Sequence, residues 1–567
     1  GETVLALVEK LDAADAEARL EACVTLSNLF NDEEGPQRAA EIIQLLASKK
    51  VFKALLRRVT DADAQVRMHA GGALCTIVAA WPPASELLAT NGFHVAALVI
   101  VQASLPDSLD DDGAQAPIQT LELALHLLCD MCKTSNKAVA AVQTAPVVGR
   151  LIEIAAAPHP KLAAAAENAS RVLSTLADDN RAFAKLIVSH PAAVDTLEQL
   201  AGNAELATRA PVTALNCTSA LLSVSIFAAH PGRLNPTSVA THLADLFCAI
   251  VHNLKEEDED DLATATLALE SLTNACSTSD TDEPCSEEED RFEAESVTAI
   301  ADLVAEHQAS ALVANIVNKA QADVASSMAA ELAPRACGFF DNLLQAASDE
   351  AVVKLGGQGM WQTAFQLLAC IGVKIKEDES SEASAAAETE ELLGAVTALA
   401  WTVARRLMSL PSTQLEVTHD HLAGLLAVAQ LSISINAQAN LVGLFGALAS
   451  PGKIKLAADD LRLLIVSLLA CTGDASLHVA LQAVDGLIDV FADDSRDDIY
   501  HSLNIESALK SPLPRFKASL DDSQLRADRA TLANVIENLE GFLAYQASKP
   551  KPPSAQQQSA APPPPQA

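Results

Sequence analysis

Residue types that could carry catalysis or hold a metal occur only as isolated pairs in this chain. The sequence has no Gly-rich phosphate loop ending in Lys-Ser or Lys-Thr, no Gly-x-Ser-x-Gly and no His-Glu-x-x-His. Cys129-x-x-Cys132 lies in an apolar run, and His419-x-His421 has only Asp420 beside it. A zinc site needs further ligands at suitable spacing. We therefore expect no enzyme activity, no cofactor and no metal; redox use of the two cysteines is the enzymatic alternative.

Small polar residues recur at a regular interval inside apolar runs, and these could bind a peptide. Six such positions, which we call the polar ladder, are separated by 48, 54, 45, 48 and 51 residues: Asn28, Thr76, Asp130, Thr175, Ser223 and Asn274. Side chains of this kind can form hydrogen bonds to the backbone of an extended peptide, as the corresponding Asn does in armadillo repeats. We predict that the polar ladder is a peptide-binding surface. The alternative is that these are ordinary polar residues of helix surfaces.

Amphipathic helices must position the ladder, because the residues around it repeat with helical spacing. The steps four, three, four and three separate Asp15, Arg19, Ala22, Leu26 and Leu29, and the same steps recur 48 residues later at Asp63, Arg67, Ala70, Leu74 and Ile77. This spacing puts the apolar members on one helical face. We expect each Asp to cap a helix and each Arg to pair with a carboxylate of a neighbouring unit. One such unit cannot bury its apolar stripe alone, so the units must stack.

Length and composition favour the same architecture. A chain of 567 residues is too long for one compact core. Half of its residues are apolar but only 3% are aromatic, so the core must be built mainly from aliphatic residues, among which Ala and Leu are strong helix formers. The predicted fold is an all-α superhelix of stacked helical repeats.

The charge balance restricts the partners. The formal net charge is -36, with 74 acidic and 38 basic side chains, so we expect repulsion from nucleic acid and anionic membranes and attraction to basic proteins. The alternative is that the acidity only maintains solubility.

Eleven scattered cysteines indicate reduced thiols and a cytosolic or nuclear location. No apolar run is long enough for a membrane span. The start at Gly1 rather than Met indicates that N-terminal sequence has been removed.

Acidic stretches interrupt the helical pattern. Residues 255–261 and 280–290 form the first, and residues 376–391 form the second. Runs of like charge repel one another, so we predict loops there. The residues expected to attract a basic partner are Glu256, Glu257, Asp258, Glu259, Asp260, Asp261, Glu287, Glu288, Glu289 and Asp290. The alternative is a solvated spacer. Residues 549–567 form a Pro-rich tail that we predict to be disordered.

Several segments resemble the symportin family of adaptors that escort ribosomal proteins to the nucleus. They are Ala483-Val484-Asp485-Gly486-Leu487-Ile488-Asp489-Val490-Phe491-Ala492-Asp493, Phe542-Leu543-Ala544-Tyr545-Gln546, the repeat at 63–77, and Leu272-Thr273-Asn274-Ala275-Cys276 before an acidic run. The resemblance implies armadillo repeats over 1–254, acidic insertions around a helix over 255–295, and HEAT-like repeats over 296–548.

The same resemblance implies a function. Symportins bind two ribosomal proteins of the large subunit that associate with 5S ribosomal RNA, and present them to an importin. The chain is then expected to be a monomeric nuclear transport adaptor and chaperone that shuttles between cytoplasm and nucleus, without direct nucleic-acid or membrane contact. The polar ladder would hold one basic cargo, and the acidic loop and HEAT section would serve the second.

Two features depart from the family pattern. The basic N-terminal import signal, through which an importin would bind, is absent from this sequence, and the acidic insertion after Asn253 is shorter than in relatives. An importin-like receptor and a regulatory scaffold for a protein complex are the alternative functions.

Overall fold

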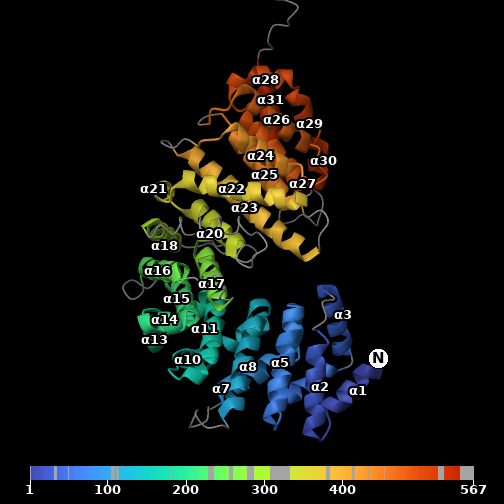
Figure 1. The fold of residues 1–567 in the computed structure, drawn as a ribbon, viewed down its shortest axis with the longest axis vertical. Coiled ribbons are helices and arrows are strands. Elements are labelled where there is room, and N and C mark those ends of the chain that lie inside the picture. Colours follow the sequence, from blue (N-terminus) through green and yellow to red (C-terminus); the bar gives the residue numbers. More distant parts are fainter. Residues whose placement is uncertain are drawn as a thin grey trace, which may run out of the picture. The chain divides into compact units, whose positions relative to one another are not determined.

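The computed structural model describes most of the chain, and its regular elements are all helices (Figure 1). The described residues are 2–30, 35–48, 50–103, 109, 114–178, 180–227, 235–253, 259–276, 287–306, 332–377, 383–410, 415–431, 433–451, 454–520 and 529–549. They contain no strand, which confirms the predicted all-α class. Contacts divide the chain into two units, Gly1–Ala309 and Ser310–Ala567.

Short and long helices alternate along most of the N-terminal unit. Its elements are α1 (Glu2–Leu11), α2 (Ala16–Asn28), α3 (Gly35–Ser48), α4 (Val51–Val59), α5 (Ala64–Ala80), α6 (Ala84–Thr90), α7 (Phe93–Gln102), α8 (Gln115–Thr134), α9 (Asn136–Val142), α10 (Ala145–Ala155), η2 (Pro160–Leu162), α11 (Ala163–Ala177), α12 (Arg181–Val188), α13 (Pro191–Ala201), α14 (Ala204–Arg209), α15 (Pro211–Phe227), α16 (Pro236–Asn253), α17 (Glu259–Cys276) and α18 (Glu287–Glu306).

The long helices of this unit form a stack in chain order. Helix α2 packs on α5, α5 on α8, α8 on α11, and α11 on α15. Of the apolar residues predicted to face the core, Ala22, Leu26, Ala70, Leu74 and Ile77 are completely buried. The prediction is wrong for Leu29, which follows the last residue of α2 as its C-cap and is 39% exposed. Two shorter helices precede and accompany α5 and α8: α3 and α4 pack on α5, and α6 and α7 pack on α8. This is the three-helix arrangement of armadillo repeats, in which each unit buries its apolar stripe against its neighbours.

The Asp-Arg pair of the repeat has the predicted capping role. Asp15 Oδ2 accepts a hydrogen bond from the Ala18 amide at 3.1 Å, and Asp63 Oδ1 accepts one from the Gln65 amide at 2.9 Å. Arg19 Nε lies 2.9 Å from Asp61 Oδ2, in the segment before the next long helix. The predicted ion pair between neighbouring units is therefore confirmed for Arg19.

The second repeat uses its arginine differently. Arg67 Nη1 donates to the backbone oxygens of Asp61 at 2.6 Å and Ala62 at 3.0 Å. Arg19 makes the equivalent bonds to Ala13 and Ala14, at 3.0 and 2.8 Å. Fixing the turn before the long helix is thus the role that both arginines share.

The C-terminal unit is built from helix pairs. Its elements are α20 (Ala333–Ala346), α21 (Asp349–Lys354), α22 (Gly357–Glu377), α23 (Ala383–Ser409), α24 (His419–Ala429), α25 (Ile435–Ala449), α26 (Ala458–Cys471), α27 (Leu477–Val490), η4 (Asp494–Arg496), α28 (Asp497–Ser502), α29 (Ile505–Lys510), α30 (Leu513–Ser519) and α31 (Arg529–Ser548). Helices α20, α23, α25, α27 and α31 contact one another in this order, while α22, α24 and α26 pack beside them. The pairing is that of HEAT-like repeats.

Small residues let the stacked helices of this unit approach closely. A Cβ atom added to Gly446 of α25 would lie 2.8 Å from the Cα atom of Gly486 of α27. A Cβ atom added to Gly443 would lie 2.6 Å from the indole ring of Trp401, on α23. Glycine at these positions therefore sets the spacing of three successive helices.

The described parts of the acidic stretches are helical, whereas the sequence pattern predicted loops there. Residues 259–261 begin α17, residues 287–290 begin α18, and residues 383–391 belong to α23. Carboxylates near a helix N-terminus interact favourably with the helix dipole, and Ala and Glu are good helix formers, which explains helix in place of loop. Residues 254–258, 277–286, 378–382 and 550–567 lie outside the described residues.

Helices α17 and α18 lie in the N-terminal unit, although the sequence pattern set residues 255–295 apart from both repeat sections. Both helices pack on α15 and α16. In the described part of the chain, no single helix is long and apolar enough to cross a membrane, although two bent helix pairs pass that test jointly.

Candidate functional site

The six ladder residues lie on consecutive helices of one stack. They belong to α2, α5, α8, α11, α15 and α17, and each of these helices contacts the next. Each ladder residue falls close to the C-terminal end of its helix. Asn28 and Asn274 are exposed, and the other four are half-buried. The structure thus arranges the polar ladder as a row of accessible groups, one per repeat.

Several ladder side chains already have partners. Thr76 Oγ1 donates to the backbone oxygen of Gly72 at 3.0 Å, and Thr175 Oγ1 lies 3.6 Å from Cys129 Sγ of the preceding long helix. Asp130 forms an ion pair with Lys133 at 3.1 Å, and His126 Nε2 lies 3.3 Å from Asp130 Oδ2. Exposed pairs of this kind contribute about 0.3–0.5 kcal/mol each, so a ligand cation could displace them at small cost.

The described residues of the predicted acidic surface lie at the starts of two helices. Glu256, Glu257 and Asp258 lie outside the described residues. Glu259, Asp260 and Asp261 form the first turn of α17, and Glu287, Glu288, Glu289 and Asp290 form the first turn of α18. The contacts of these helices with α15 and α16 put both acidic turns in the ladder-bearing unit.

The Cys129-x-x-Cys132 pair has the character of core residues. Both thiols are buried on α8. Burial raises the pKa of the Cys132 thiol to about 12, with a smaller contribution from Cys129. A thiol with this pKa is almost entirely protonated at neutral pH, and the thiolate is the form that reacts or binds metal. The structure therefore disfavours the redox alternative.

The two histidines of His419-x-His421 connect neighbouring repeats. His419 Nδ1 lies 2.7 Å from Asp460 Oδ1 of α26. His421 Nδ1 accepts a hydrogen bond from the Thr418 amide at 3.3 Å, which completes a capping box at the start of α24. The His421 ring also lies 4.3 Å from the Phe365 ring of α22. Both side chains thus have a structural role between helices.

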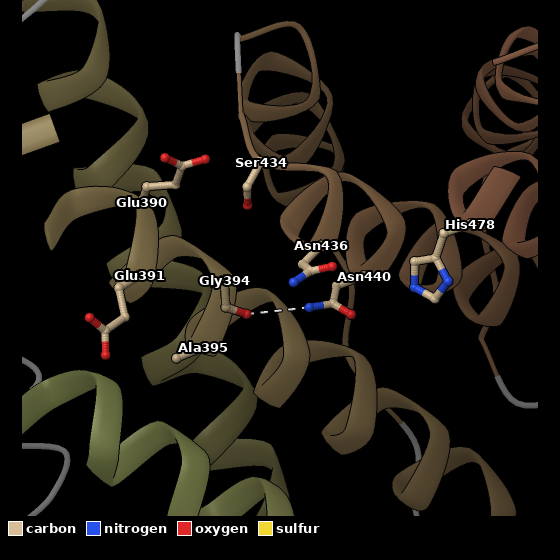
Figure 2. Close-up of a pocket in the computed structure, with 8 residues that line it drawn as sticks. All are labelled: Glu390, Glu391, Gly394, Ala395, Ser434, Asn436, Asn440 and His478. Carbon is tan, nitrogen blue, oxygen red and sulfur yellow. Dashed lines mark hydrogen bonds between the residues drawn. The ribbon is translucent and has the colours of Figure 1, made fainter. Parts of the chain in front are cut away.

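A polar hollow of about 620 Å³ opens in the C-terminal unit, at residues that the sequence pattern did not single out (Figure 2). Three successive stacked helices line it: α23, α25 and α27. The lining residues, which we call the polar hollow, are Glu390, Glu391, Gly394, Ala395, Ser434, Asn436, Asn440 and His478.

Hydrogen bonds fix part of the hollow. Asn440 Nδ2 donates to the backbone oxygen of Gly394 and to Thr397 Oγ1, both at 3.3 Å, which ties α25 to α23. Ser434 Oγ accepts from the Ala437 amide at 3.3 Å and caps α25. Glu390 and Glu391 are both exposed on the α23 wall. A preformed set of hydrogen-bonding groups thus lies across from Glu390, whereas the Glu391 side chain points away from them (Figure 2).

The Asn440 contact belongs to a series that a search for equivalent positions could have found. Asn168 Nδ2 donates to the Glu122 backbone oxygen at 3.4 Å, and Asn216 Nδ2 donates to Ser170 Oγ at 3.2 Å. In each of these cases the partner lies 46 residues earlier in the chain. These asparagines bond neighbouring long helices to each other, so their interval reports the length of one repeat.

Comparison with known proteins locates the family likeness in the second half of the chain. Residues 300–550 match the family model described as "SYO1-like, TPR repeats", SYO1 being the symportin. The resemblance to the symportin family is thereby confirmed. The family description names TPR repeats, which are pairs of helices like those seen in the C-terminal unit. No curated protein matches the chain.

Several solved structures match the chain at low identity. An importin beta structure has 12% identity and a TM-score of 0.45, covering 98% of this chain and 70% of that one. An engineered protein has 17% identity and a TM-score of 0.43, covering 86% and 98%. A computationally designed armadillo repeat protein for modular peptide recognition has 16% identity and a TM-score of 0.32, covering 47% and 99%. At these levels the likeness says nothing of partners.

Proposed function

We propose that the chain is a transport adaptor and chaperone for basic ribosomal proteins of the large subunit, the pair associated with 5S ribosomal RNA. The observation that carries this proposal is the match of residues 300–550 to the SYO1-like family. The proposal includes movement between cytoplasm and nucleus and contact with an importin.

Charge provides independent support. Ribosomal proteins expose Lys and Arg side chains that neutralise RNA inside the ribosome, and outside it these groups attract other polyanions. A partner with net charge -36 offers a temporary substitute. Complementary charge accelerates encounter and favours basic over neutral partners, and its effect weakens as salt is added.

In this proposal the polar ladder binds one extended basic segment. Its six residues are accessible, lie on consecutive helices and recur once per repeat. A repeating row suits an extended peptide, since successive side chains can reach successive backbone groups. The acidic first turns of α17 and α18 would attract the same or a second cargo.

Variants of the ladder test this proposal. Asn28→Arg and Asn274→Arg each introduce a bulky cation into the row, and we expect each to weaken the binding of the purified ribosomal proteins by about tenfold. Ala192→Arg is the matched control, because Ala192 is an exposed residue of α13, outside the ladder helices.

Affinity is measured by titration of fluorescently labelled cargo, and folding by circular dichroism. If the folded ladder variants bind as tightly as the Ala192→Arg control, the ladder is not the binding surface. If the wild-type chain binds neutral control proteins as well as it binds ribosomal proteins, the chaperone function itself is excluded, as expected for a general scaffold.

A further inference from the structure

The polar hollow combines features that fit one kind of ligand. Two exposed carboxylates, Glu390 and Glu391, lie on the wall formed by α23. Amide, hydroxyl and imidazole groups from α25 and α27 lie across from Glu390, while the exposed Glu391 side chain points away from them (Figure 2). A ligand that satisfies both walls must carry a cation and also hydrogen-bonding groups.

A peptide segment with a Lys or Arg side chain meets both requirements. Its ammonium or guanidinium group can pair with the glutamates, and its backbone can bond Asn436, Asn440 and Ser434. The Nδ2 atom of Asn440 already donates within the chain, so its Oδ1 atom is the group placed to accept from a ligand amide. An inorganic anion would be repelled by both glutamates.

We propose that the polar hollow is a binding site for a basic peptide segment, separate from the polar ladder. This inference deepens the proposed function and rests on it, because it assigns a second cargo contact to a particular part of the C-terminal unit. The hollow joins three successive helices, so an occupant would contact α23, α25 and α27 together.

Gly394 allows the hollow to be filled without disturbing the fold. A Cβ atom added to Gly394 would meet nothing within 4 Å. In a Gly394→Leu variant the new side chain would therefore occupy open space in the hollow. Gly541 of α31 is the matched control, since it is exposed, lies inside a helix, and also has nothing within 4 Å of an added Cβ.

The experiment uses the full chain and a fluorescent eight-residue peptide of alternating Lys and Arg that carries a photo-crosslinking group. We expect the peptide to cross-link to residues lining the hollow and Gly394→Leu to weaken its binding there by about tenfold. The double variant Glu390→Gln, Glu391→Gln should weaken binding at that site to a similar extent, because each exposed ion pair contributes up to about 1 kcal/mol, or roughly fivefold. Gly541→Leu should bind as the wild type does.

The inference is overturned if cross-links are confined to other helices, if both hollow variants retain wild-type affinity, or if inorganic phosphate competes as well as unlabelled peptide. The last result would assign the hollow to anions. If the wild type binds ribosomal proteins while the hollow variants bind them and the peptide equally well, only the inference fails. If the wild type binds neither ribosomal proteins nor the peptide, the proposed function fails with it.

Discussion

Replacing Gly446 by Ala should separate helices α25 and α27. The added Cβ atom would lie 2.8 Å from the backbone Cα atom of Gly486, whereas carbon atoms in contact prefer about 3.5–4.0 Å. The shortfall of about 1 Å cannot be relieved by a side-chain rotation, because the neighbour is backbone. Overpacking of this kind costs about 1–3 kcal/mol of stability.

Gly394→Ala isolates this steric cost from helix propensity. Ala stabilises a helix interior by about 0.5–1 kcal/mol relative to Gly, and this gain applies to both variants. Gly394 lies on the neighbouring helix α23, and an added Cβ there meets nothing within 4 Å. We therefore expect Gly394→Ala to be more stable than the wild type, and Gly446→Ala to be less stable than Gly394→Ala by about 1–3 kcal/mol.

Urea unfolding followed by circular dichroism measures the difference between the two variants. Because repeat proteins often unfold in more than one step, hydrogen exchange of the α25 and α27 amides should accompany it. Faster exchange in these two helices of Gly446→Ala is the expected local signature. Equal stability of the two variants would show that α25 and α27 do not cross at Gly446 and Gly486, and would refute the stacking described for this unit.

Three further predictions concern the N-terminal unit. Leu26→Ala and Leu74→Ala should each lower the free energy of unfolding in urea by about 2–5 kcal/mol, because both side chains are fully buried. Leu29→Ala is the control and should cost much less, since Leu29 is 39% exposed. Equal costs for the three variants would contradict the burial of Leu26 and Leu74. Burial opposes ionisation of Asp61, but its hydrogen bonds from Arg19 and the Asp63 amide and the nearby charge of Arg58 leave the pKa lowered overall. The ionised Asp61 carboxylate therefore stabilises the folded chain above the pKa of Asp in the unfolded chain, and this stabilisation is lost as the pH falls through the lower pKa of the folded chain. The stability difference between wild type and Asp61→Asn should shrink as the pH falls below about 4. A difference that stays constant with pH would exclude a stabilising role for the ionised carboxylate. Finally, Cys132 should resist iodoacetamide at pH 8 in the folded chain and react in urea, as mass spectrometry of the digested protein would show; equal labelling in both states would contradict its burial.

The helical stack could be predicted because burial leaves a periodic trace in the sequence. Leu26 and Leu74 occupy equivalent places in two repeats, and the same spacing predicted the caps at Asp15 and Asp63. Which groups each arginine would bind was harder to predict from the sequence. Both arginines bond backbone oxygens of the preceding turn, and Arg19 also reaches the Asp61 carboxylate 42 residues away, a contact that local spacing does not encode.

The acidic segments show where local reasoning failed. A run of like charges predicts a loop if the residues are considered alone, but residues 259–261 and 287–290 begin helices that pack on a neighbouring repeat. The same error concealed Glu390 and Glu391, which belong to α23 and line the polar hollow. The hollow itself depends on the register between α23, α25 and α27, and no single helix encodes that register.

The spacing of the ladder could also be predicted from the sequence. Its one-per-repeat interval was visible from Asn28 to Asn274, and the structure adds that the six helices are consecutive neighbours. Peptide binding along this row is a prediction for the ladder variants.

Titration of the wild-type chain with the purified 5S-RNA-associated ribosomal proteins, at low and at high salt, tests whether this chain is a chaperone for basic cargo. We expect a tight complex at low salt that weakens steeply as salt is added, and no complex with neutral proteins of similar size. Absence of binding at low salt, or equal binding of the neutral proteins, would contradict this function.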